Sequence, residues 1–322
     1  MQDDMTFTVD PWDPGYSAAL NAEALAELDA TSAELDLDVE MSAADWRPVT
    51  PDPGTAPPDV LLIADGVRRI DARVWTHTSD GAEPMPGIAA SCAAGIVRCA
   101  PGEGAELAAV EVSRSLFSAS PHAVDIAAGY RARRAPGSGM EELSLALQRH
   151  LTRLEVELAV PHRAGDDLLV VDGPLRGRAH LPRTVGFIKT HHTAYLPAPQ
   201  AATVSRLLPG QRTPIFLMGT SWRRHAWYLR LPGQSGMPWA GVVRCEASAE
   251  LSRDDLVRLA DSVSHALPPL AGVDYKDPRA PQNLIPIGGL ERLLRHRLGD
   301  ARLLYRALRS AAARQPDLQP VP

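Results

Sequence analysis

Cysteine is scarce in this sequence of 322 residues. The chain has three cysteines, Cys92, Cys99 and Cys245, and none of them forms a CxxC pair. An odd number of widely spaced cysteines argues against a disulfide framework and against a cysteine-based zinc site. We therefore expect three idle thiols.

Long apolar runs are also missing. A membrane-spanning helix needs about 20 mostly apolar residues, and no segment approaches that length. The acidic N-terminus, MQDDMTFTVDP, lacks the basic and apolar regions of a signal peptide. We expect a protein without membrane spans that resides in the cytoplasm.

Two further absences narrow the function. The GxxxxGK[ST] phosphate-binding loop does not occur, which disfavours a nucleotide hydrolase. The formal net charge is −6, so any contact with nucleic acid has to rely on a local basic surface. The composition, with 45% hydrophobic and 22% charged residues, is that of a globular chain able to bury a sizeable core.

The residue pattern divides the chain into three parts. Residues 1–57 join an acidic, Ala/Leu-rich stretch, typical of a helix, to the proline-rich connector VTPDPGTAPPD. We interpret them as an N-terminal helical appendage, either a solvated one or one that docks onto a partner. Residues 58–310 are predicted to fold as one domain, and residues 311–322 as a C-terminal tail.

Within this domain the pattern alternates between strands and helices. The runs VLLIAD, IDARVW, IAASCAAGIVRC and AELAAVEVSRSLF predict an antiparallel meander. A leucine stripe in MEELSLALQRHLTRLEVELA predicts a helix, and DDLLVVDGPL and TVGFIKTH predict the next strands. Further strands are expected in PIFLMG, AWYLRLP and WAGVVRCE, with one helix opening at Ser252 and a last one from about Gly289 to Arg309. This is an α/β fold with a mixed central sheet flanked by helices.

Two strands share one ending. LLIADG and LLVVDG each place an aspartate, Asp65 or Asp172, after four apolar residues and before a glycine. We expect both carboxylates at the carboxyl ends of their strands, the sheet edge where α/β proteins bind ligands. Two such carboxylates repel each other unless one is protonated or a hard cation bridges them. Mg²⁺ or Mn²⁺ is the expected bridge, although two turn-forming Asp-Gly pairs remain the alternative.

A third carboxylate is expected nearby. The helix before the second strand offers Glu155 and Glu157, on opposite sides of its leucine stripe, and periodicity does not distinguish them. We prefer Glu155. Glu111, in the run AAVEVSR, is a weaker candidate because strand alternation would equally well place it in solvent.

The order of the motifs resembles that of NurA family proteins. The resemblance rests on IADGVRRIDARVW, VVDGPL, VGFIKTH, WYLRLPG, VVRCE and DPRAPQNLIPIGGLERLLR, and it covers about residues 58–310. It implies an RNase H-like, Mn²⁺- or Mg²⁺-dependent DNA nuclease that forms a homodimer. It also implies work in DNA end processing with the hexameric ATPase and translocase HerA.

The resemblance also implies the site residues. Asp65 and Asp172 match the two aspartates of the family, Glu155 approximately matches the glutamate between them, and Lys189 falls where the family carries a lysine. These three carboxylates would hold the metal, and Lys189 would offset phosphate charge. The adjacent His191 and His192 are not expected to ligate a metal together.

This sequence departs from the family pattern at two places. Val67 replaces a serine after the first DG, and Gly288 lies near the place of a histidine, where Gln282 or Asn283 would be neutral substitutes. A non-catalytic DNA-binding or scaffold subunit of the same fold is therefore the alternative function. Two arginine clusters are candidates for DNA contact, Arg131, Arg133 and Arg134 in one, Arg176, Arg178 and Arg183 in the other.

Overall fold

The computed structural model describes most of the chain. The described residues are 5–9, 34–78, 83–126, 128–191, 194–220, 222–233, 239–273, 275–276 and 279–314. Most of the helical stretch expected in the N-terminal appendage falls in residues 10–33, and most of the expected tail in residues 315–322, so both lie outside the described residues.

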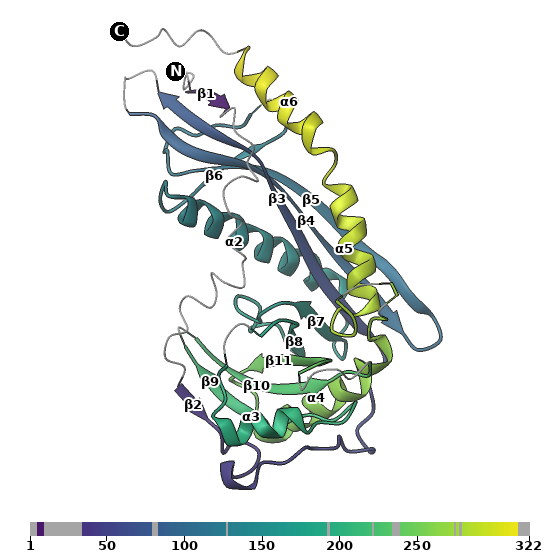
Figure 1. Ribbon diagram of the computed structural model, residues 1–322. Helices are drawn as coiled ribbons and strands as arrows, with labels where there is room; N and C mark the ends of the chain where they lie inside the picture. Colours follow the sequence, from purple (N-terminus) through teal and green to yellow (C-terminus); the bar gives the residue numbers. More distant parts are fainter. Residues whose placement is uncertain are drawn as a thin grey trace.

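One large sheet of 11 strands organises the fold (Figure 1). Its order is β2-β9-β10-β11-β8-β7-β3-β4-β5-β6, and β1 pairs with the far end of β3. The β3–β7, β7–β8 and β5–β6 pairs are parallel and the others antiparallel. The strands are β1 (Met5–Val9), β2 (Glu34–Asp36), β3 (Leu61–Thr78), β4 (Met85–Ala100), β5 (Gly104–Ser118), β6 (Arg131–Arg134), β7 (Leu168–Asp172), β8 (Thr184–Ile188), β9 (Phe216–Gly219), β10 (Arg223–Arg230) and β11 (Val242–Ser248).

Helices flank this sheet, as the sequence predicted for a mixed α/β fold. They are α2 (Met140–Ala159), α3 (Ala198–Ser205), α4 (Arg253–Ala266), α5 (Ile285–Arg297) and α6 (Ala301–Ala312). The leucine stripe of α2 is buried, and Ser252 caps α4 by accepting a hydrogen bond from the backbone N–H of Asp255. Strands β4 and β5, helix α2 and strands β7 to β11 lie where the sequence pattern predicted them.

Strand β3 differs from the sequence prediction. We expected two strands separated by a turn at Asp65-Gly66, but β3 runs without a break from Leu61 to Thr78. The pairing with β4 continues through both residues and shifts register only between Ile70 and Ala72. Asp65 is therefore inside a long strand and not at its end, because the neighbouring β4 supplies a continuous partner that Gly66 does not interrupt.

The last helix also differs. The expected single helix from Gly289 to Arg309 is two helices, α5 and α6. Gly299 between them has a φ of 82°, a conformation that ends a helix and that glycine adopts readily. Asp300 then starts α6 by accepting a hydrogen bond from the backbone N–H of Leu303 at 2.9 Å.

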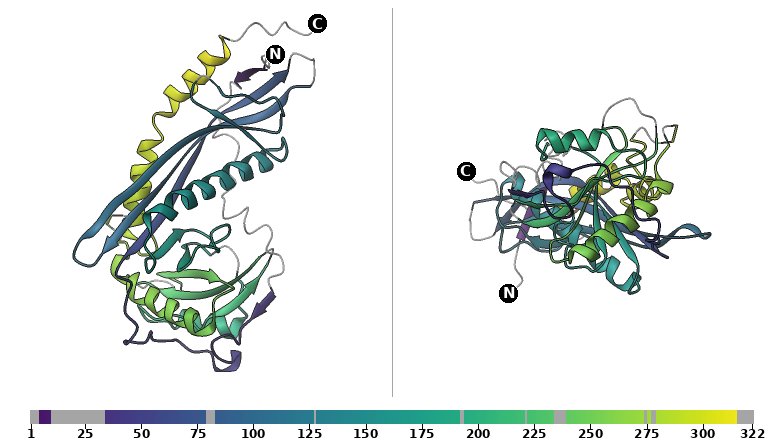
Figure 2. Two further views of the ribbon diagram at one scale, coloured as in Figure 1. Left: turned by 180° about the vertical axis from the view of Figure 1, so that it is seen from behind. Right: turned by 90° about the horizontal axis from the view of Figure 1, so that it is seen from below.

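The helices cover opposite faces of the long sheet. Helix α2 packs on the face that carries Ile88, Ala90 and Cys92 of β4. Helices α5 and α6 pack on the other face, where α5 contacts Val67 of β3 and Ala93 of β4. Figures 1 and 2 show α2 and the α5–α6 pair on either side of β3, β4 and β5. The side on which a β3 residue projects thus decides which helix it meets.

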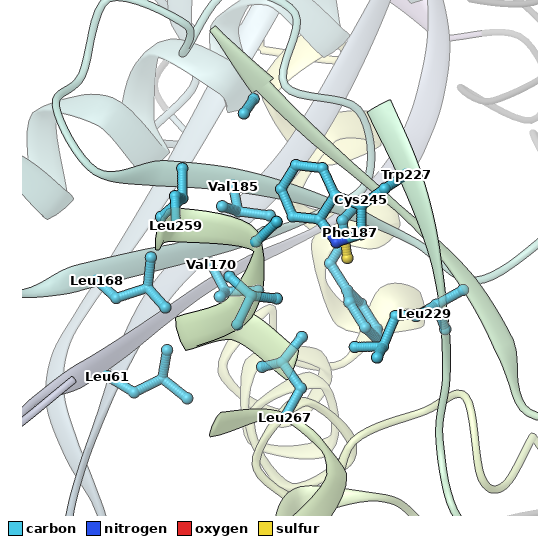
Figure 3. Close-up of a cluster of buried hydrophobic side chains, with 14 of the residues drawn as sticks. Leu61, Leu168, Val170, Val185, Phe187, Trp227, Leu229, Cys245, Leu259 and Leu267 are labelled. Atoms are coloured by element: carbon cyan, nitrogen blue, oxygen red, sulfur yellow. The ribbon is translucent and has the colours of Figure 1, made fainter. Parts of the chain in front are cut away.

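A core of aliphatic and aromatic side chains fixes the strands that carry the candidate site (Figure 3). Leu61 and Ile63 of β3 pack there with Leu168 and Val170 of β7, and α4 covers them. Complete burial of one such side chain contributes roughly 1.5–3 kcal/mol. Strands β3 and β7 are therefore packed into this core just before Asp65 and Asp172.

Part of the predicted appendage belongs to this sheet. Strand β2 pairs with β9, and Trp46 is buried against Phe216, with ring centroids 6.0 Å apart. Glu40 accepts two hydrogen bonds from the buried Arg212, at 2.7 and 2.9 Å. Residues 34–57 are thus built into the fold, since they contribute a strand, a core side chain and a buried ion pair.

Two expected absences concern the described part of the chain. No helix there is long and apolar enough to cross a membrane. The three cysteines are free thiols, with Cys92 and Cys245 buried and Cys99 half-buried.

Candidate functional site

Strand pairing places Asp65 at an opening in the sheet. Strand β7 pairs with β3 only along Leu61–Ala64, so Asp65 is the first residue of β3 beyond this parallel ladder. On that side of β3, the next described strand is β1, which begins to pair at Val74. Asp65 is only 7% exposed and accepts a hydrogen bond from its neighbour, the backbone N–H of Gly66, at 2.7 Å.

Asp172 lies on the neighbouring strand, at its last residue. The chain turns at Gly173, whose φ of 100° is in the region that favours glycine. Lys189, directly after β8, donates to Asp172 Oδ2 at 2.6 Å and to Asn283 Oδ1 at 3.0 Å. Its ammonium thus lies between a carboxylate and an amide oxygen. Sequence reasoning predicted Asp172 and Lys189 as site residues and considered Asn283 only as a neutral substitute.

Asp65 and Asp172 project toward the same face of the sheet. Side chains alternate along a strand, and Ile63 and Val170, two residues before each aspartate, both lie in the core under α4. Burial raises the pKa of Asp65 well above its ordinary value, and the negative charge of Asp172 raises it further, while Lys189 lowers it. Two carboxylates therefore lie close together here, and the Lys189 ammonium pairs with one of them, Asp172.

Glu155 approaches from the opposite face. This side chain of α2 is buried, whereas Glu157 and Glu111 are exposed. A Cβ added to Gly66 would lie 2.5 Å from Glu155 Oε1, so glycine at this position lets Glu155 reach β3 next to Asp65. Of the three glutamates considered from the sequence, Glu155 is the one that the structure places beside the two aspartates.

Arg178 neutralises Glu155. The two side chains form a buried ion pair, and Arg178 also donates to the carbonyl oxygen of Pro174 at 2.9 Å. Burial raises the pKa of Glu155, and the charge of Arg178 lowers it. Arg178 was a candidate for DNA contact, but this ion pair assigns it to the interior. The loop after Asp172 therefore connects the end of β7 back to α2.

Glu246 is a site neighbour that sequence reasoning missed. This fully buried residue of β11 accepts a hydrogen bond from the backbone N–H of Leu175 at 3.1 Å and pairs with Arg224 at 3.2 Å. It lies opposite Gly186 of β8, where an added Cβ would be 2.7 Å from the Leu175 nitrogen. Gly186 thus lets the loop after Asp172, which contains Leu175, cross β8 and reach Glu246. The signal in the sequence was the charge at the end of the apolar strand GVVRCE.

The remaining candidates lie outside this arrangement. Gly288 is inside α5, and its N–H donates to the carbonyl oxygen of Leu284. His191 packs edge-on against Trp239, with centroids 5.1 Å apart, and His192 lies outside the described residues. Arg133 donates to Ser115 Oγ, whereas Arg131, Arg134, Arg176 and Arg183 are exposed.

The three carboxylates do not converge as a three-ligand metal cluster. Among the described residues, no group of three or more His, Cys, Asp and Glu side chains is placed to hold a metal ion. Glu155 instead pairs with Arg178. Asp65 and Asp172 still suit a hard cation, because Mg²⁺ is often bound through one or two carboxylates, several waters and substrate phosphates. The Lys189 ammonium lies between Asp172 and Asn283 and offsets part of the negative charge of this pair of aspartates.

The comparisons with known proteins give no further information on the family or function of this chain. No protein-family model matches the chain, and no curated protein is similar enough in sequence to count as a relative. The identification of this site therefore rests on the geometry of Asp65, Asp172, Glu155 and Lys189.

Proposed function

We propose that this protein is a metal-dependent deoxyribonuclease that uses Mn²⁺ or Mg²⁺. The observation that carries the proposal is the pair formed by buried Asp65 and half-buried Asp172 on adjacent strands, with Lys189 as their cationic neighbour. Like charges are costly to bury, and proteins keep such pairs mainly where chemistry requires them. The resemblance of the DG motifs to those of NurA nucleases points to phosphodiesters as the substrate.

Each residue has a chemical task in this proposal. Asp65 and Asp172 would hold the cation, and Lys189 would turn from Asp172 toward a substrate phosphate. A bound divalent cation supplies a water of lowered pKa and stabilises the departing oxygen. Glu155, paired with Arg178 on the other face of β3, would act as a positioning residue that holds Gly66, and with it Asp65, in place. No protein nucleophile is needed.

The fold is part of the same proposal. We assign the RNase H-like unit to strands β5, β4, β3, β7 and β8, which follow one another in the sheet, together with α2. Its antiparallel half carries Asp65 and its parallel half carries Asp172. The junction of the two halves is where the carboxylates meet, which supports a catalytic role for this edge.

We propose partners from the resemblance as well. Because the sequence has no phosphate-binding loop, any ATP-driven movement along DNA would come from a partner. The protein would work as a homodimer in the cytoplasm, with a HerA-like ATPase as the translocase. Because β1 and residues 34–57 are built into the sheet, a docking role for the appendage would have to come from its other residues.

A cleavage assay tests the proposal. Purified protein should cut end-labelled single- or double-stranded DNA with Mn²⁺ or Mg²⁺ and should stop when EDTA is added. Asp172→Asn should abolish cleavage, and Glu157→Gln, an exposed change of the same type, should not. Cleavage that survives both EDTA and Asp172→Asn would overturn the proposal. DNA binding without any cleavage would favour the alternative, a non-catalytic scaffold subunit.

A further inference from the structure

Helices α5 and α6 carry an excess of positive charge in an acidic protein. Residues 285–314 contain seven arginines and two carboxylates, whereas the chain as a whole has a net charge of −6. Five of these arginines form what we call the α5–α6 arginine face: Arg292, Arg297, Arg302, Arg306 and Arg309. All five are exposed.

These arginines are not used to stabilise the fold. Within the described chain, no ion pair or hydrogen bond engages their side chains, unlike Arg295, which pairs with Glu291 at 2.6 Å. Two other arginines, Arg69 and Arg114, donate to the backbone carbonyls at the end of α5 and so perform the structural task there. The charge of the arginine face is therefore available to a partner.

Three of the five arginines form a stripe on α6. Arg302, Arg306 and Arg309 stand four and three residues apart, which places them on one side of α6, opposite the buried Leu308 and Ala311. At about 1.5 Å per residue the three span roughly 10 Å along the helix. A row of fixed positive charges of this length matches a polyanion better than a single small anion.

Helix α5, which leads into the stripe, begins beside the candidate site. Asn283, which accepts a hydrogen bond from Lys189, lies two residues before α5. Helix α5 packs on the face of β3 that presents Val67, the same face toward which Asp65 projects. From there α5 and α6 run one after the other along the long strands, away from the site (Figure 1).

We infer that the α5–α6 arginine face binds the phosphate backbone of DNA and guides the strand to Asp65 and Asp172. This inference rests on the proposed function, because it takes the substrate to be DNA. Arginine suits the task, since its planar group donates two hydrogen bonds to a phosphate and stays charged at any relevant pH. Phosphate contacts of this kind set affinity and position without reading sequence.

The test compares two variants with the same loss of charge. The first, Arg302→Gln/Arg306→Gln/Arg309→Gln, keeps good helix formers on α6. The control, Arg47→Gln/Arg206→Gln/Arg258→Gln, changes three exposed arginines elsewhere. Binding of a fluorescein-labelled DNA oligonucleotide, as a single strand and as a duplex, is measured by anisotropy in EDTA over a range of salt concentrations. Melting temperatures check that both variants fold.

We expect the α6 variant to bind at least tenfold more weakly at low salt, and its slope of log Kd against log salt to fall by about two. The control should stay within about twofold of the wild type. Equal losses in both variants, or unchanged binding by the α6 variant, would overturn the inference, as would binding of anionic phospholipid vesicles but not of DNA. Because EDTA blocks cleavage, an inactive but DNA-binding protein would contradict the proposed function and leave this inference standing.

Discussion

Two aspartates of strand β3, Asp65 and Asp71, are both buried, yet their surroundings differ. Asp71 occupies the register shift between Ile70 and Ala72 and accepts hydrogen bonds from Arg69, Ser91 and Tyr130, at 2.7, 2.5 and 2.9 Å. Asp65 accepts one, from the backbone N–H of Gly66, and its other close charged neighbours include the carboxylates Asp172 and Glu155.

This difference separates a structural carboxylate from a candidate catalytic one. Three donors compensate Asp71 for the loss of water, so its charge helps to hold the strands together. Burial and the like charges of Asp172 and Glu155 disfavour the ionised form of Asp65, and Lys189 offsets only part of this cost. Sites that keep such a cost are commonly functional. Burial alone therefore does not identify the site, whereas burial beside like charges does.

The largest expected effect is on catalysis. Asp65→Asn and Asp172→Asn should each lower Mn²⁺-dependent DNA cleavage by about 100-fold or more, because each removes a metal ligand. Asp65→Asn should leave the melting temperature of the metal-free protein unchanged or raised, since it relieves repulsion. Cleavage is followed on labelled DNA and unfolding by calorimetry. Full activity in Asp65→Asn would remove the contrast between the two aspartates.

Asp71→Asn should have the opposite effects: it should lower stability and leave the cleavage activity nearly unchanged. Loss of a charge that accepts three hydrogen bonds should lower the free energy of unfolding by about 2–3 kcal/mol. The specific cleavage activity of the folded fraction should stay close to that of the wild type. Urea unfolding measures the first quantity and a cleavage assay the second. An Asp71→Asn protein that is stable but inactive would place the active site at the register shift instead.

The third prediction concerns Glu155. Glu155→Gln should lower kcat by about tenfold with little change in KM for DNA, because Arg178 would no longer hold a carboxylate at Gly66. Glu157→Gln, on the exposed side of the same helix, should change neither value by more than about twofold. Equal effects of the two substitutions would show that α2 does not contribute to the reaction.

The smallest effect is expected from His150. This residue of α2 is buried beside Ser113, whose Oγ lies 2.8 Å from its Nε2, and burial lowers its pKa to about 4 from 6.5. The unfolded chain binds a proton more readily, so the stability due to neutral His150 is present above pH 6.5 and is lost as the pH falls toward 4. His150→Gln should flatten the change of melting temperature over this range. Its cleavage activity should be unaffected, since His150 lies apart from the carboxylates.

Much of the fold could be predicted from local patterns. The leucine stripe of α2, the apolar run of β7 and the cap at Ser252 specify their elements through neighbours only a few residues away. The unbroken course of β3 through Asp65-Gly66 could not be predicted in this way. It depends on its pairing with β4, a partner about 30 residues away in the sequence.

The candidate site could likewise be predicted only where local sequence patterns specify it. Repeated DG motifs identified Asp65 and Asp172, and burial later distinguished Glu155 from Glu157. The ion pair of Glu155 with Arg178 and the contact of Glu246 with the loop were not visible, because both join segments that only the folded sheet brings together. The integration of residues 34–57 was missed for the same reason, since β2 pairs with the distant β9.

A titration of Mn²⁺ tests the central claim most directly. Free Mn²⁺ is followed by electron paramagnetic resonance in three separate titrations, one each with the wild-type protein, Asp65→Asn and Asp71→Asn. We predict that the wild type removes the free-ion signal, that Asp71→Asn does the same, and that Asp65→Asn binds at least tenfold more weakly. Equal binding by wild type and Asp65→Asn, or no binding by the wild type, would contradict the assignment of the β3–β7 edge as a metal-dependent active site.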